Sequence, residues 1–153
     1  MAPLTRGLLV LLHLLGAIAW FGGMWFAYFC LRPAAAEALD PAHRLPLWAA
    51  TFGRFFRYLA LIVVAVVLSG FVLLLQTGLR AAPTGWLVMA SLGLAMTAVF
   101  SYVYLVLYPR LNTYCRAASW PDAALVLNDI RRWVAMNLVF ALGAVAAAVL
   151  ARP

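Results

Sequence analysis

A single histidine within a long apolar run is the first residue whose type could do chemistry. His13 is the only ionisable side chain inside such a run, because the arginines and the four acids lie at the run ends or in the loops. An ionisable group within a bilayer is costly, so it is a functional candidate by default. A neutral imidazole suits haem iron or copper. A histidine that only hydrogen-bonds to another helix is the alternative, and the sequence leaves both interpretations open.

Small and aromatic side chains share the helical face of His13. Gly16, Trp20 and Gly23 follow it at spacings of three or four residues. Small residues at this spacing allow a neighbouring helix, or a flat cofactor, to approach closely. The candidate cofactor-binding residues are therefore His13, Gly16, Trp20 and Gly23, with helix packing as the alternative role for the glycines.

Three methionines form a second candidate set. Met89 and Met96 are seven residues apart, hence on one helical face, and Met24 continues the face of His13. Thioethers are soft ligands that select Cu(I), although methionine is also an ordinary filler of apolar gaps. His13 and Met24 are about 16 Å apart along one helix, so they would mark successive positions on a path. The candidate metal-binding residues are His13, Met24, Met89 and Met96.

Other chemistry-bearing patterns are weaker. Cys30, Cys115 and His43 could form a soft-metal site near the first and third loops, but nothing in their spacing requires it. The simpler interpretation is that neither thiol binds a metal. The sequence has no G-x-S-x-G, no phosphate loop and no H-E-x-x-H, and no acid lies within an apolar run. These absences argue against hydrolytic or phosphoryl chemistry and favour a protein that is not an enzyme.

The segments that carry these residues need lipid as their solvent. The chain is 68% hydrophobic and 10% charged, against about 25% charged in soluble domains. Apolar runs cover residues 7–31, 55–77, 85–108 and 133–150. Each is about long enough to cross the hydrocarbon layer, where backbone groups must be satisfied within a helix. We predict an all-α integral membrane protein, a four-helix bundle forming a single membrane domain over residues 1–153.

The positions of the arginines predict an orientation rather than a nucleic-acid partner. Three lie with the two termini and the second loop, whereas eight border the first and third loops. Positive residues favour the cytoplasmic side and anionic lipid headgroups, so both termini are predicted to be periplasmic. The run at 7–31 is too long for a signal peptide core, and Arg32 follows it directly, so we expect no cleavage.

Two helix-start signals lie in the predicted cytoplasmic loops. Asp40 precedes Pro41 as an N-cap precedes a proline at the first helical position. Ser119 and Asp122 are spaced as in a capping box. We predict short interfacial helices at both places, each leading into the next span.

Buried polar residues within the spans predict contacts between helices. Asn137 and Ser69 are each expected to hydrogen-bond across helices, at about 1 kcal/mol. The tight loop between the second and third spans predicts that these two spans are antiparallel neighbours.

The motifs of the first span and of several later segments resemble one bacterial family. The segments are residues 13–24 (HLLGAIAWFGGM), 31–34 (LRPA), 44–48 (RLPLW), 54–56 (RFF), 104–110 (YLVLYPR), 130–132 (IRR) and 137–138 (NL). They resemble short, four-span members of the copper-resistance protein D (CopD) family. The resemblance implies a bacterial inner-membrane protein of copper uptake or tolerance, with His13 and the methionines nearest the ion. Longer members carry extra spans and more histidine and methionine.

The first span is also similar to that of HemJ-type protoporphyrinogen oxidases, membrane haem proteins in which a first-span histidine serves the haem. That similarity implies a b-type haem with His13 as axial ligand. The spans hold no second histidine, so a His–Met pair or two copies of His13 across a homodimer would be needed. A third hypothesis is a cofactor-free partner subunit whose glycine face docks on another membrane protein.

Overall fold

Every regular element of the protein is helical in the computed structural model, which describes residues 3–151. The elements are α1 (Pro3–Trp25), η1 (Phe26–Leu31), α2 (Arg32–Ala38), α3 (Pro41–Thr77), α4 (Thr84–Tyr102), η2 (Val103–Leu107), α5 (Tyr108–Arg116) and α6 (Trp120–Leu150). They join into four stretches that are long and apolar enough to cross a membrane: Pro3–Ala38, Pro41–Thr77, Thr84–Arg116 and Trp120–Leu150. The predicted all-α architecture with four spans is confirmed.

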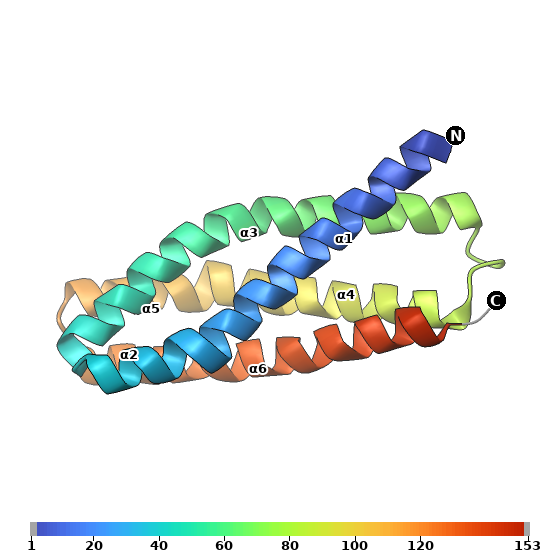
Figure 1. Ribbon diagram of the computed structural model, residues 1–153. Helices are drawn as coiled ribbons and strands as arrows, with labels where there is room; N and C mark the ends of the chain where they lie inside the picture. The colour runs from blue at the N-terminus through green and yellow to red at the C-terminus, as the bar shows by residue number, and fades with distance from the viewer. Residues whose placement is uncertain (1–2, 152–153) are drawn as a thin grey trace.

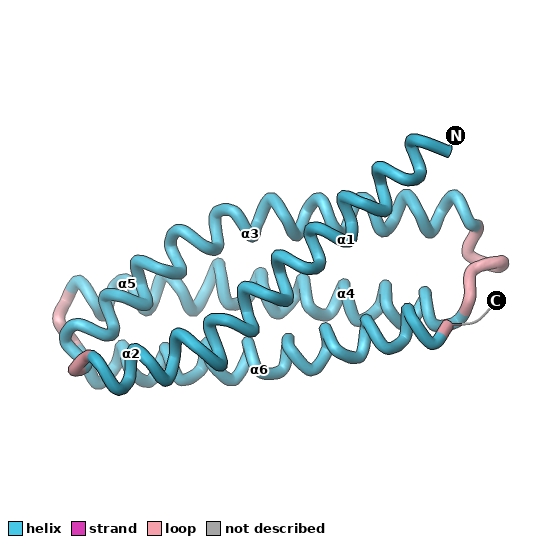
Figure 2. The backbone as a smooth tube through the Cα atoms, viewed as in Figure 1, coloured by secondary structure: helices cyan, strands magenta, loops and turns pink. Residues whose placement is uncertain are grey.

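The four stretches lie side by side with alternating direction (Figure 1). Both described chain ends and the loop at 78–83 lie at one end of the bundle, and the connections at 39–40 and 117–119 lie at the other (Figure 2). We name these the terminal end and the arginine end. The most extensive packing is α1 against α3 and α4 against α6. The second and third spans are antiparallel, as predicted, but each packs mainly against another partner.

The expected interfacial helices form and, as predicted, lead directly into the spans. Asp40 caps α3, since its Oδ1 accepts a hydrogen bond from the backbone N–H of His43 at 3.0 Å. From there α3 runs without interruption for 37 residues, about 55 Å against a hydrocarbon layer of about 30 Å. Because the uncharged part of α3 is its second half, the surplus length projects at the arginine end.

The start of α6 differs from the predicted capping box. α6 begins at Trp120, directly after Ser119, as expected. The Ser119 hydroxyl donates to the Asp122 carboxylate at 2.6 Å and forms no cap with the backbone N–H groups. The two side chains therefore satisfy each other instead of capping the helix reciprocally.

Two wide π-helical turns interrupt the first and third stretches, and each lies just before a proline. η1 ends at Leu31 ahead of Pro33, and η2 ends at Leu107 ahead of Pro109. A proline ring clashes with the carbonyl four residues earlier and supplies no N–H. A wide turn relieves both problems without ending the helix. π turns of this kind are frequent at functional sites.

The buried core is concentrated in the half of the bundle toward the arginine end. Its centre is a chain of ring contacts that includes a stacked Phe52–Phe56 pair and Phe56 against Phe100 and Tyr104. On α1 the buried residues are Trp20 and Met24, near its end, and on α4 they begin at Met96. The first half of α1 and of α4 therefore has its large apolar side chains largely on the surface, where lipid would contact them.

Candidate functional site

The structure brings two of the predicted metal-binding residues together at a buried asparagine. Asn137 of α6 is 3% exposed. Its Nδ2 donates to the backbone oxygen of Met96 at 3.3 Å and lies 3.9 Å from the Sδ of Met24. The predicted hydrogen bond across helices is therefore confirmed for Asn137. α1, α4 and α6 meet at this point, and we name it the Asn137 site.

Two buried polar atoms in this part of the core have no hydrogen-bond partner among the described residues. They are the Oδ1 of Asn137 and the Nε1 of Trp20. Trp20 is one turn before Met24 on the same face of α1, and its ring packs edge-on against Phe100 at 6.3 Å. An unmet polar group in an apolar core costs about 1–3 kcal/mol. The free oxygen of the Asn137 amide is an acceptor that a small cationic guest could use.

The other two predicted metal-binding residues lie elsewhere. Met89 is half-buried and seven residues before Met96, about 10 Å along α4. His13 is eleven residues before Met24, about 16 Å along α1. The four predicted residues are thus spread along the bundle, and among them the hydrogen bonds described for residues 3–151 join only Met24 and Met96 to Asn137, Met96 through its backbone oxygen.

His13 is anchored to α3 through one ring nitrogen. Its Nδ1 lies 2.9 Å from the backbone oxygen of Val66 and 3.2 Å from the Oγ of Ser69. A carbonyl oxygen can only accept, so Nδ1 carries the proton, and the neutral ring then keeps its lone pair on Nε2. Metal-bound histidines commonly hold one nitrogen on a carbonyl in this way. The contact also confirms that Ser69 bonds across helices.

The glycine face of α1 is covered by side chains of α3. A Cβ added at Gly16 would collide with Val66, and one at Gly23 would collide with the ring of Phe55. A Cβ added at Gly22, by contrast, would meet nothing within 4 Å. Gly16 and Gly23 therefore let α1 and α3 approach closely, which is the packing role that the sequence left as the alternative.

The cysteines and the loop histidine do not form a metal cluster. Cys30 is exposed, and Cys115 is half-buried on another element. The Nδ1 of His43 is 2.8 Å from the Oδ1 of Asp40. Among residues 3–151, no group of three or more histidine, cysteine or acidic side chains is placed to hold a metal ion.

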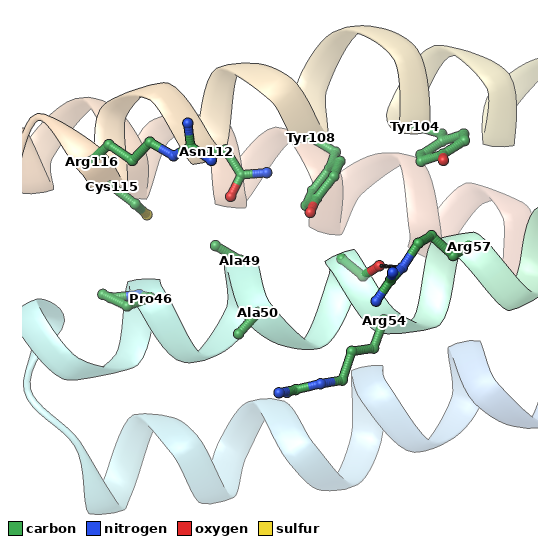
Figure 3. Close-up of a pocket in the computed structure, with 11 residues that line it drawn as sticks. Pro46, Ala49, Ala50, Arg54, Arg57, Tyr104, Tyr108, Asn112, Cys115 and Arg116 are labelled. Atoms are coloured by element: carbon green, nitrogen blue, oxygen red, sulfur yellow. Dashed lines mark hydrogen bonds between the residues drawn. The ribbon is translucent and has the colours of Figure 1, made fainter.

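Two cavities lined by arginines lie toward the arginine end. The larger, of about 640 Å³, lies between α3 and the η2–α5 segment, where Tyr108 and Asn112 reach from α5 toward α3 (Figure 3). The smaller, of about 280 Å³, lies between η1–α2, α3 and α6 and is lined in part by Arg32, Arg44 and Arg131. The sequence analysis interpreted these arginines as an orientation signal and as attraction to anionic lipid headgroups, and it did not predict that they line cavities. The four-residue spacing of Tyr104, Tyr108 and Asn112 marks one face, but which helix it would meet depends on the tertiary fold.

The fold and the Asn137 site together define a multi-pass membrane protein, a four-helix bundle with a buried polar and thioether site at its centre. Comparison with family models gives a match to copper resistance protein D over residues 49–151. The chain belongs to this family, and the resemblance seen in the sequence is confirmed. It is a membrane protein related to copper resistance. No curated protein and no solved structure matched the chain.

The matched segment covers three of the four spans. Met89, Met96 and Asn137 lie within it, as do the arginines of the larger cavity. His13 and Met24 precede residue 49, so the candidate residues of the first span have no support from the family match.

Proposed function

We propose that this chain binds and handles copper in the bacterial inner membrane, with Cu(I) held at the Asn137 site by the thioethers of Met24 and Met96. The observation that carries the proposal is that one buried amide contacts both methionine residues, Met24 through its sulfur and Met96 through its backbone oxygen. Thioethers are soft donors that favour Cu(I) over hard cations. Membership of the copper resistance protein D family supports the choice of metal.

His13 and Met89 have a separate role in this proposal. Both lie between the terminal end and the Asn137 site, at about 10–16 Å from it along their helices. With Nδ1 of His13 donating to Val66, Nε2 is the nitrogen that would receive a metal ion. If the terminal end is periplasmic, as the arginine distribution predicts, His13 and Met89 would meet the ion first and Met24 and Met96 would hold it.

Packing on α1 favours copper over haem. A flat haem beside His13 would need space along the glycine face, and Val66 and Phe55 of α3 fill that space at Gly16 and Gly23. A single ion needs no such gap.

A Cu(I) titration of the purified protein in mild detergent, against a competing chromophoric chelator, tests the proposal. We expect Met24→Leu/Met96→Leu to lose the site, because leucine keeps the volume but lacks the sulfur. Met136→Leu is the matched control, since Met136 is a half-buried methionine of α6 that packs against the core. Within residues 3–151, the hydrogen bonds of the Asn137 side chain go to Met24 and Met96 and not to the Met136 side chain. Equal Cu(I) affinity in wild type and the double variant would refute the assignment.

A further inference from the structure

The larger arginine-lined cavity holds positive charge that its surroundings do not neutralise. Arg54, Arg57 and Arg116 line a space of about 640 Å³, and no carboxylate lines it. The acid–base pairs found among residues 3–151 involve other cations. All three arginines are exposed, so the cavity presents their charges to ligands from outside. An anion in the cavity would be attracted by these charges.

Arg57 is oriented by its own helix. Its Nε donates to the backbone oxygen of Gly53 at 2.9 Å, one turn earlier on α3 (Figure 3). This bond fixes the plane of the guanidinium and leaves its terminal nitrogens to carry the remaining donors. A planar guanidinium presents paired donors that match the oxygens of a phosphate group.

The opposite wall of the cavity adds neutral polar groups and no acid. Tyr104, Tyr108 and Asn112 line it at four-residue intervals. The Tyr108 hydroxyl lies so close to Gly53 that a Cβ there would overlap it, so the glycine is what allows α5 to approach α3 here. Hydroxyl and amide donors beside arginines suit an oxyanion, and the lack of a carboxylate disfavours a cation.

The cavity lies at the level expected for lipid phosphates. Residues 58–77 of α3 contain no charged side chain, and twenty residues of helix cross the hydrocarbon layer of about 30 Å. Arg54 and Arg57 come directly before this segment, so they lie where the hydrocarbon layer ends. Basic pockets between transmembrane helices at this level are typical binding places for anionic headgroups.

We propose that this cavity binds a phosphate group, supplied either by the headgroup of an anionic phospholipid or by a small soluble phosphate compound. The cavity is within the range of about 300–1,000 Å³ that is usual for ligand pockets. The proposal does not depend on copper, and copper binding at the Asn137 site could fail without affecting it.

The test uses the full chain in a non-ionic detergent, with phosphatidylglycerol and inorganic phosphate as separate probes. The thermal unfolding midpoint is followed against the concentration of each probe. We expect at least one probe to raise the midpoint of the wild type. Stabilisation by phosphatidylglycerol alone identifies a lipid headgroup, and stabilisation by inorganic phosphate identifies a soluble compound.

Charge variants distinguish binding in the cavity from non-specific attraction to the positive charge of the arginine end. Arg57→Gln/Arg116→Gln removes one arginine from each wall and should weaken probe binding by about tenfold or more. Arg110→Gln/Arg132→Gln is the control, because it removes two charges from the same end, at positions equally exposed but outside the cavity; Arg132 also pairs with Asp129 at 3.7 Å. Ala50→Phe adds a ring at the edge of the cavity and keeps every charge, and it should also weaken binding.

Three results would overturn the proposal. The first is a wild type that neither probe stabilises. The second is an equal loss in Arg57→Gln/Arg116→Gln and in Arg110→Gln/Arg132→Gln, which would mean non-specific attraction. The third is full binding in Ala50→Phe, which would place the phosphate outside the cavity.

Discussion

A histidine inside an apolar helix must satisfy two ring nitrogens, and His13 uses one of them to tie α1 to α3. The contact with Val66 and Ser69 gives a packing reason for the residue that holds whether or not metal is bound. Gly70 completes the arrangement, since a Cβ there would lie 2.7 Å from the imidazole Cε1. The imidazole therefore occupies the place that a side chain at position 70 would take.

Gly70→Ala should destabilise the protein. The added methyl group would push the imidazole away from Val66 and break the hydrogen bond between α1 and α3. An alanine within a helix is otherwise favoured over glycine by about 1 kcal/mol, so a drop in the thermal unfolding midpoint would come from the collision. Gly22→Ala is the control, because its Cβ would meet nothing within 4 Å. An equal or higher midpoint for Gly70→Ala than for Gly22→Ala would contradict the described packing.

The sequence identified the buried polar residues but not all of their partners. His13, Ser69 and Asn137 stand out because a polar side chain in an apolar run must find a partner. Across helices, the backbone oxygens that His13 and Asn137 bond are 53 and 41 residues away in the chain. Nothing in the local sequence marks one carbonyl among many, so these pairings follow only from the packed structure.

At the scale of the elements, the start of α3 is set by a local signal that the sequence shows plainly. Asp40 caps the helix through His43, and the pKa of Asp40 is lowered chiefly by the side-chain hydrogen bond from His43, with the backbone N–H of His43 next. A lowered pKa in the folded state means that the carboxylate form stabilises the fold. This contribution is complete above the ordinary value of 3.8 and is lost as the pH falls through the lowered pKa.

Asp40→Ala should therefore lower the thermal unfolding midpoint at neutral pH, because the first turn of α3 loses its cap. The difference between wild type and variant should be present at neutral pH and narrow below pH 3.8, as the wild-type carboxylate takes up its proton. Unfolding scans of both proteins at each pH measure this difference. A gap that widens in acid would mean that the carboxylate does not cap the helix.

The sequence predicted where helices start but not how they pass their prolines. The helices that begin after Asp40 and Ser119 lead into the spans, as predicted. Pro46 lies within α3 without ending it. The π turns before Pro33 and Pro109 also keep their helices continuous. Packing against neighbouring helices offsets the local cost of these prolines, and that packing is invisible to a local pattern.

At the scale of the whole molecule, the bundle has a marked polarity. Arg6 and Arg80 are the arginines of the terminal end within residues 3–151, and Arg152 lies outside the described residues. The remaining eight lie toward the other end, where the four acids also are. The predicted asymmetry therefore corresponds to two physical ends, and the choice of side rests on the positive-inside rule.

A reporter fused to the C-terminus should be exported. We expect alkaline phosphatase activity from a C-terminal fusion and no fluorescence from a green fluorescent protein fusion at the same position. Fusions after the loop at 117–119 provide the reciprocal control and should give the opposite pair of signals. A fluorescent C-terminal fusion would mean that the orientation is opposite to the predicted one and that the arginine-lined cavities lie on the periplasmic side.

The most direct test of the copper proposal is the metal content and absorption spectrum of the protein purified from cells grown with copper and a haem precursor. The account predicts a protein without a Soret band, before or after dithionite, that carries about one copper per chain and loses it in Met24→Leu/Met96→Leu. A Soret band with stoichiometric iron, abolished in His13→Ala, would contradict the account and make the chain a haem protein.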